Sequence, residues 1–341
     1  MPSAKLPITG GWGMRAIYAI LLIISLQVAA ADKFEWLPDQ PGTTKLVVAK
    51  DNTKMYGLSA ADMASFDASL QRLRDIIVAQ PIFKAPVGVT IDGYMRADDH
   101  PPKAKGVPVP AFGRCLSMPC LRDEKSGKPG WFQYTTDELE IKVNNPAAAL
   151  EAFGYHDGDM KLCYEPTRVG EIDGFPLFRA ANGNEIVAFS SNGNLPWEPY
   201  TREELTKMMI RYWQDQAAQN TMDPIAPQIV QGQQEYLAKM SPEEKKMQAW
   251  FLDGGLGIFA PPLAPLGSDL GRPIVKIPAK WYDSSLPRSA IQSIVLRFLY
   301  SNRIDHDKPG PDKTGCVSAY RLYQYLRSAD LKAVATALTT K

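Results

Sequence analysis

Each of the three histidines in this 341-residue chain lies next to aspartate. The three sets are Asp98-Asp99-His100, His156-Asp157 and Asp305-His306-Asp307. Imidazole nitrogens and carboxylate oxygens are common ligands of divalent metals, and a metal-bound water can attack a hydrolysable bond. If the sets converge in the fold, they predict a metal-dependent hydrolase. If they do not, each marks a polar surface turn, where aspartate is common.

Under the hydrolase hypothesis, the catalytic residues are His156, Asp157 and His306. The metal ligands are then drawn from His100, His156, His306, Asp305 and Asp307. The sequence predicts no organic cofactor, because it has no phosphate-binding loop and no dinucleotide fingerprint between a strand and a helix. It also has neither a Gly-x-Ser-x-Gly elbow nor a His-Glu-x-x-His helix, so no established catalytic motif supports this hypothesis.

A second route to hydrolysis would use a pair of carboxylates. Glu165, Glu171 and Asp173 lie in a β-rich region, and a glycosidase needs two such groups about 5–10 Å apart. Three tryptophans beside turn residues are candidates for a sugar platform: Trp131, Trp197 and Trp281. The alternative is that these rings pack in the core, as large aromatic side chains commonly do.

The chain has four cysteines: Cys115, Cys120, Cys163 and Cys316. An even number of cysteines in an exported protein favours disulfides. A turn through Pro119 would bring Cys115 and Cys120 within the Cα separation of about 7 Å that a disulfide allows, and would leave Cys163 to pair with Cys316. A metal cluster is the weaker interpretation, because no Cys-x-x-Cys pair is present.

The N-terminal segment has the features of a secretory signal peptide. Arg15 precedes the apolar run 16–26, and the small residues Ala29 and Ala31 form a cleavage site. The run is shorter than the roughly 20 residues that a membrane-spanning helix needs, so we expect no stable span after cleavage. We therefore predict a signal peptide over 1–31, with Met14 as an alternative initiator, and a periplasmic or extracellular location.

The charge balance restricts the partners. The formal net charge of +1 becomes −1 when residues 1–31 are removed, because that segment holds two cations, Lys5 and Arg15, and no acid. A chain so evenly balanced gives no electrostatic reason to bind nucleic acid. An apolar share of 45% predicts a packed core. The binding partners that stay compatible with this composition are a protein and an extracellular ligand.

Hydrophobic periodicity predicts the elements of the first region, 32–200. A capped amphipathic helix is expected over 59–80 and a strand over 87–95. A long irregular segment that is rich in proline and carries two of the cysteines should follow over 101–131. Between 131 and 195 apolar and polar residues alternate, as in strands with one buried face. Asn182-Gly183 and Asn192-Gly193 predict turns of a β-meander.

The second region, 201–341, has more helical signals. Thr201 with Glu204, and Ser241 with Glu244, have the spacing of capping boxes. The run 291–300 is apolar on both faces, which fits either a helix or a buried strand, and we expect a strand. One or two closing helices should begin at Val317.

The resulting fold class is α+β: a mainly antiparallel, twisted sheet flanked by amphipathic helices, with a helix-rich C-terminal half packed on the same core. Because catalytic motifs are absent and long loops are present, the leading functional hypothesis is a non-catalytic binding or interaction protein. The alternative is a metal-dependent or carboxylate-based hydrolase that acts on an envelope or extracellular substrate.

Overall fold

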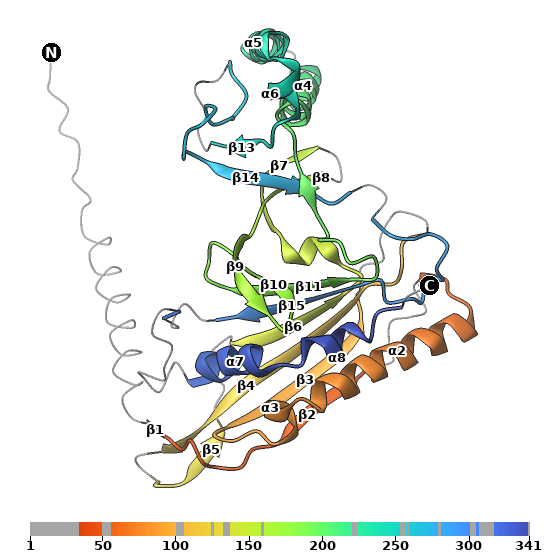
Figure 1. Cartoon of the computed structure of the whole chain (residues 1–341), viewed down its shortest axis with the longest axis vertical. Coiled ribbons are helices and arrows are strands. Elements are labelled where there is room, and N and C mark those ends of the chain that lie inside the picture. Colours follow the sequence, from red (N-terminus) through yellow and green to blue (C-terminus); the bar gives the residue numbers. More distant parts are fainter. Residues whose placement is uncertain are drawn as a thin grey trace, which may run out of the picture.

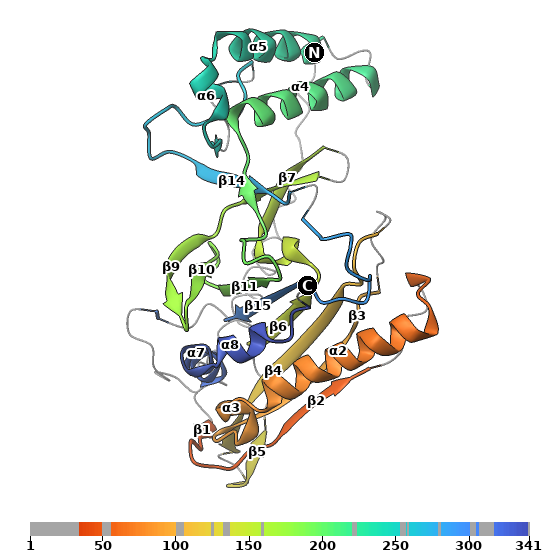
Figure 2. The same cartoon turned by 45° about the vertical axis from the view of Figure 1, so that its right-hand side comes forward.

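A computed structural model describes residues 34–49, 56–99, 106–123, 126–131, 137–157, 160–219, 224–252, 257, 259–278, 281–300, 305–306 and 317–339. The side chains of 152–161 lie outside this description. The predicted signal peptide also lies outside the described residues. Figures 1 and 2 show a large lobe built on one long sheet and a small lobe that projects from one end of it.

The large lobe contains a ten-stranded, mostly antiparallel sheet. In spatial order its main strands are β2 (Thr44–Val48), β3 (Val89–Ala97), β4 (Ala111–Asp123), β6 (Glu138–Val143), β15 (Ser293–Leu299), β11 (Glu185–Ser190), β10 (Phe175–Arg179) and β9 (Thr167–Ile172). Two short strands, β1 (Phe34–Trp36) and β5 (Pro129–Trp131), pair with the distal end of β4. Only β2 and β3 run parallel among these pairs. The predicted sheet is therefore confirmed in its class and in its main orientation.

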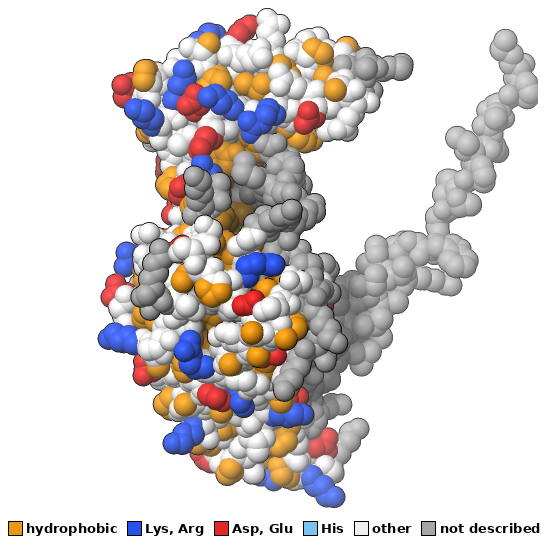
Figure 3. Space-filling view, turned by 90° about the vertical axis from the view of Figure 1, so that its right-hand side faces the viewer, with side chains coloured by type: hydrophobic (Ala, Val, Ile, Leu, Met, Phe, Trp, Pro, Cys, Tyr) orange, Lys and Arg blue, Asp and Glu red, His pale blue; other side chains and the backbone are white. Residues whose placement is uncertain are grey.

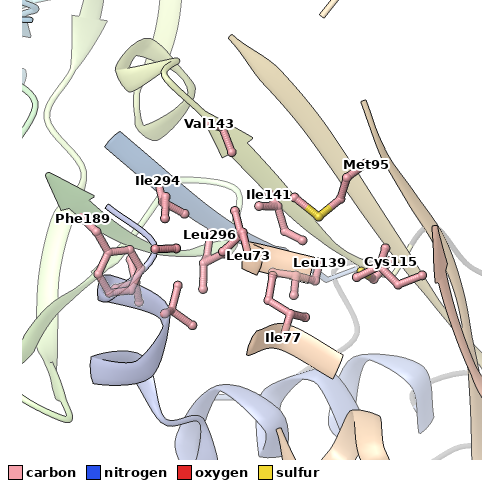
Figure 4. Packing of buried hydrophobic residues seen from close by; sticks show 14 of the residues in the cluster. Leu73, Ile77, Met95, Cys115, Leu139, Ile141, Val143, Phe189, Ile294 and Leu296 are labelled. Atoms are coloured by element: carbon pink, nitrogen blue, oxygen red, sulfur yellow. The ribbon is translucent and has the colours of Figure 1, made fainter. Parts of the chain in front are cut away.

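One face of this sheet is covered by helices α2 (Ala60–Val78), α3 (Pro81–Lys84), α7 (Val317–Ser328) and α8 (Leu331–Ala335). Helix α2 begins where predicted, because the Ser59 side chain accepts a hydrogen bond from the Asp62 N–H and serves as the N-cap. Figure 4 shows Leu73 and Ile77 of α2 packed among side chains of the sheet, including Ile141 of β6. The core of the large lobe thus lies between α2, α7 and the inner face of the sheet.

The small lobe combines a five-stranded sheet with three helices. Its elements are β7 (Glu151–Asp157), β8 (Met160–Tyr164), β12 (Glu198–Pro199), α4 (Arg202–Gln219), α5 (Ala226–Lys239), α6 (Pro242–Lys246), β13 (Trp250–Phe251) and β14 (Arg272–Lys276). Both halves of the predicted capping box at α4 are present, since Glu204 accepts from the Thr201 N–H and Thr201 Oγ1 accepts from the Glu204 N–H. Leu205 and Met209 of α4 pack in the core of this lobe.

A third apolar cluster joins the lobes. It combines Cys163 and Val275 of the small sheet with Phe178 and Val295 of the large sheet. The short 3-10 helix η2 (Pro146–Ala149) also contributes to it. This cluster covers the outer face of the large sheet over β10, β11 and β15, and leaves β2, β3 and β4 outside it.

Strand β4 corrects the expected irregular segment at 101–131. Its inner face carries small side chains, among them Ala111, Gly113 and Cys115, and α7 packs against them. A Cβ on Gly113 would lie only 2.8 Å from Cγ of Met95. The small residues allow this close packing, but they lack the β-branched signature on which a strand prediction depends.

Pro119 is compatible with this strand because of where it lies in the pairing. Pairing with β6 extends to Leu116, and pairing with β5 begins only at Cys120. Pro119 therefore lies between these two pairings, where the strand needs no N–H donor on the side of β4 that faces β6 and β5.

The predicted helix-rich C-terminal half is not supported as such. Residues 201–341 also supply β13, β14 and β15, and β15 is a central strand of the large sheet. The two sequence regions interleave, because β7 and β8 from the first lie in the small sheet while α7 and α8 from the second cover the large one. Across the described residues, no helix combines the length and apolar character needed to cross a bilayer.

Candidate functional site

The outer face of the large sheet over β2, β3 and β4 carries an ordered grid of side chains. The strand register places Lys45, Asp92 and Leu116 in one row across these strands. The next row contains Val47, Tyr94 and Arg114. Directly paired residues on neighbouring strands project from the same face, so each row presents its side chains together. No described helix covers this part of the sheet, because the helices of the large lobe pack on its inner face.

These two rows enclose a concavity of about 320 Å³. Its lining consists of Lys45, Val47, Asp92, Gly93, Tyr94, Arg114 and Leu116. Gly93 shapes it by letting the strand backbones approach closely, since a Cβ at this position would lie 2.2 Å from the carbonyl oxygen of Arg114. The concavity therefore offers two cations, one carboxylate, an aromatic ring and two aliphatic side chains within one small area.

Arg114 is held in place by Glu138 of β6. Its Nε donates to the carboxylate of Glu138, whose side chain is 7% exposed, while 35% of the Arg114 side chain remains exposed. Burial raises the pKa of Glu138, and the charge of Arg114 opposes that rise. Among the described residues, the terminal nitrogens of Arg114 have no hydrogen-bond partner. Arg114 is thus oriented by one side of its guanidinium and keeps donors for a ligand on the other.

The same face continues across β6 and β15 as a network of paired charges. Glu140 accepts from Arg297 at 2.9 Å and lies 3.3 Å from the Lys142 ammonium. The Lys142 ammonium also lies 3.9 Å from the ring centroid of Phe112. These charges already have partners, so they border the concavity and leave Lys45 and Arg114 as its available cations.

A second polar cluster is buried on the inner face of the sheet, around Glu185. This carboxylate is fully buried and accepts hydrogen bonds from both terminal nitrogens of Arg327 on α7 and from the Tyr300 hydroxyl. Arg179 approaches the same carboxylate at 3.2 Å. Burial alone would raise the pKa of Glu185, but Arg327 and the Tyr300 hydroxyl hold it below its usual value.

His306 completes this cluster. Its Nε2 lies 3.0 Å from the carbonyl oxygen of Gly183, and its Nδ1 lies 3.5 Å from Glu185. Burial lowers the pKa of His306, and although Glu185 opposes the shift, Arg179 and Arg327 reinforce it. Two guanidinium groups beside this imidazole make the position unfavourable for a metal cation. The cluster instead fixes α7 to the ends of β10, β11 and β15.

The histidine sets predicted as a metal site are only partly described. His306 and Asp305 are placed, while His100 and Asp307 lie outside the described residues. The backbone of His156 and Asp157 belongs to β7 of the small sheet, and their side chains are not described. Among the described residues, no group of three or more His, Cys, Asp or Glu side chains is arranged to hold a metal ion. The convergence of the three sets stays a prediction.

The predicted disulfide between Cys115 and Cys120 is wrong for this fold. Both residues belong to the single extended strand β4, and their thiols are buried and not bonded to each other. At about 3.3 Å per residue, five strand positions separate two Cα atoms by far more than the roughly 7 Å limit. The turn expected at Pro119 is absent because the strand continues through it. Cys316 lies outside the described residues, so its pairing with Cys163 stays a prediction.

The other candidate residues are dispersed. Glu165 accepts a hydrogen bond from Gln248 in the small lobe, Glu171 pairs with Arg168 on β9, and Asp173 pairs with Lys332. Of the tryptophans, Trp197 is buried against Phe178, Trp281 is buried, and Trp131 is exposed on β5. The structure therefore favours core packing for Trp197 and Trp281.

The grid on β2, β3 and β4 was missed by sequence reasoning. The sequence predicts the strand that carries Asp92 and Tyr94, but these residues form a site only together with Arg114, which lies in the segment predicted to be irregular. No protein-family model, curated protein or solved structure matches the chain. The functional argument rests on the site.

Proposed function

We propose that this chain is an exported, non-catalytic binding protein whose ligand occupies the concavity over β2, β3 and β4. The observation that carries the proposal is the lining of that concavity, which combines two available cations with Tyr94, Val47 and Leu116 on a sheet face that no described helix covers. Concave sites with a few oriented polar groups among apolar side chains are typical of ligand binding. Export rests on the N-terminal sequence 1–31.

The lining indicates the chemistry of the ligand. Lys45 and Arg114 lie at opposite corners of the grid, which favours an anionic group such as a carboxylate. Tyr94 lies between Val47 and Arg114 in its row and offers a ring face to an apolar group. Asp92, beside Lys45, disfavours a dense polyanion. We therefore expect a ligand with one acidic group and one compact apolar group.

A ligand-observed NMR screen tests this proposal on the mature protein. The probes are small carboxylic acids that carry one aromatic or branched apolar group, each matched with its neutral primary amide. We expect the acids to bind and the amides to lose at least about tenfold in affinity, which corresponds to about 1.4 kcal/mol for the charge-assisted contact.

Two variants locate the binding. Lys45→Glu reverses an exposed charge at the concavity, and Lys239→Glu makes the same change on exposed α5 of the small lobe. Acid binding should fall in Lys45→Glu and stay unchanged in Lys239→Glu. Equal binding of acids and amides, or equal affinity in the two variants, would contradict the proposed site.

A further inference from the structure

The large sheet has two lateral edges, β2 and β9, and they differ in regularity. Strand β9 carries a bulge, since its register with β10 shifts between Leu177 and Phe178 and leaves Val169 without a direct partner. A bulge twists an edge away from further pairing and is a common protection against strand addition. Strand β2 pairs with β3 in unbroken register from Thr44 to Val48.

The free edge of β2 presents a row of backbone groups. The Ile91 N–H donates to the Thr43 carbonyl and the Ala49 N–H donates to the Met95 carbonyl, each at 2.8 Å. In a parallel ladder this pattern turns the N–H and C=O groups of Thr44, Leu46 and Val48 away from β3. Within the described chain, none of these six groups has a hydrogen-bond partner. Strand β2 can therefore accept another strand.

This edge adjoins the concavity. Lys45 and Val47 alternate with the edge-facing residues and project onto the outer face, where Val47 is 46% exposed. A strand added to β2 would extend the two rows of the grid by one position each. The added side chain beside Lys45 would meet a cation, and the one beside Val47 would meet an aliphatic surface.

We propose that β2 binds an extended peptide segment of a protein partner by strand addition, with an acidic side chain beside Lys45 and an apolar side chain beside Val47. This inference rests on the proposed function and adds a protein partner that binds at the β2 edge of the same site. The backbone of the peptide pairs with Thr44, Leu46 and Val48, which supplies affinity without sequence preference. The alternate side chains reach the outer face and supply the specificity.

Selection of random eight-residue peptides displayed on phage, with the full mature protein as the target, provides the probes. We expect enriched peptides to place an acidic residue two positions from a β-branched or aromatic residue. In NMR titrations, the selected synthetic peptide should shift the amide signals of Thr44, Leu46 and Val48. Failure to enrich any such pattern, or shifts confined to another surface, would overturn the inference.

Backbone methylation of the peptide separates strand addition from simple side-chain contact. In a peptide that pairs antiparallel to β2, the residues opposite Thr44, Leu46 and Val48 donate their N–H groups to β2. Methylating those nitrogens removes these hydrogen bonds, and we expect at least a tenfold loss of affinity. Methylating the alternate residues, whose N–H groups point to solvent, serves as the matched control and should change affinity little. Equal losses in both peptides would show that no strand is added.

A charge swap fixes the register. Lys45→Glu should weaken the selected acidic peptide at least tenfold, and replacing the acidic residue of the peptide with lysine should restore binding to that variant. Lys239→Glu is the control. If the small carboxylates bind as proposed while no peptide is selected, the binding site stands and the strand addition fails. If neither binds, both proposals fail.

Discussion

At the scale of single residues, Glu185 is a carboxylate that the fold buries completely. A fully buried carboxylate is stable only when its charge is matched, and Arg327, Arg179 and Tyr300 provide that match. Burial raises the pKa of Glu185, but the hydrogen bonds from Arg327 and Tyr300 outweigh it and lower that pKa, so the folded state holds the ionised form more strongly than the unfolded state does. The stability from this group is therefore present above the unfolded pKa of about 4.3 and is lost as the pH falls through the lower folded value.

We predict that Glu185→Gln destabilises the protein at pH 7 by about 1.5–3 kcal/mol, the range for hydrogen bonds to charged groups. The difference in unfolding free energy between wild type and variant should stay constant from pH 7 to about 5 and shrink below about pH 4. Urea denaturation across this pH range measures it. A difference that stays constant down to the lowest accessible pH would contradict the assigned role.

His306→Gln is the matched control, because the histidine that it removes changes protonation over a different pH range from Glu185. The folded pKa of His306 is lowered, so protonation favours the unfolded state once the pH falls below its ordinary value of about 6.5. As the pH falls from about 7 toward the folded pKa, wild type should therefore lose stability relative to His306→Gln, and this loss should start at a higher pH than the Glu185 effect. If the His306 effect appeared at lower pH than the Glu185 effect, the pH dependences assigned to these two residues would be wrong.

The residue scale also shows why the sequence indicated His306 but not its partners. A histidine between two aspartates is conspicuous, whereas Glu185 at the start of an alternating strand resembles an ordinary solvent-facing residue. Its burial depends on α7, which lies more than a hundred positions further along the chain and brings Arg327 over it. Local patterns contain no information about such a long-range contact.

At the scale of elements, the predictions succeeded where one local signal dominates. The Ser59 cap defines the start of α2, the Thr201 and Glu204 pair defines α4, and Asn182-Gly183 forms the predicted hairpin between β10 and β11. The short run at 291–300 was also correctly assigned, as β15. Strand β4 was missed because its inner side chains are small and Pro119 interrupts its pattern, although both features suit the packing around it.

Strands β3 and β4 lead to a prediction about the concavity. We expect Gly93→Ala to destabilise the protein by about 1–3 kcal/mol, the usual cost of overpacking, because the new Cβ would meet the Arg114 carbonyl. Gly170→Ala on β9 is the control, since its Cβ would have no atom within 4 Å. Urea midpoints of both variants measure the difference. If Gly93→Ala costs no more than Gly170→Ala, the strands have room to separate and the concavity is not shaped by this contact.

At the scale of the whole molecule, the two lobes have separate apolar cores. The small-lobe core centres on α4 and β14, with Leu205 and Ile274 fully buried, and the large-lobe core lies between α2, α7 and the sheet. On the face seen in Figure 3, charged side chains of both signs are spread over the two lobes. The third cluster, with Val275 against the strands of the large sheet, is the apolar connection between them.

This arrangement predicts unequal stability. The small-lobe core is the smaller of the two, so we expect it to open without the large lobe, as locally cooperative units often do. Leu205→Ala should lower the exchange protection of amides in α4, α5 and β14 by about 2–5 kcal/mol, the cost of a buried leucine truncation, while β6 and β15 keep theirs. Leu73→Ala in α2 should lower protection in both lobes, because β8 and β14 lose their support when the large sheet opens.

Hydrogen exchange followed by mass spectrometry measures both variants. Equal loss in β6, β15 and α4 for Leu205→Ala would show that the third cluster couples the lobes into one unit, and ligand binding at β2 would then protect the small lobe as well.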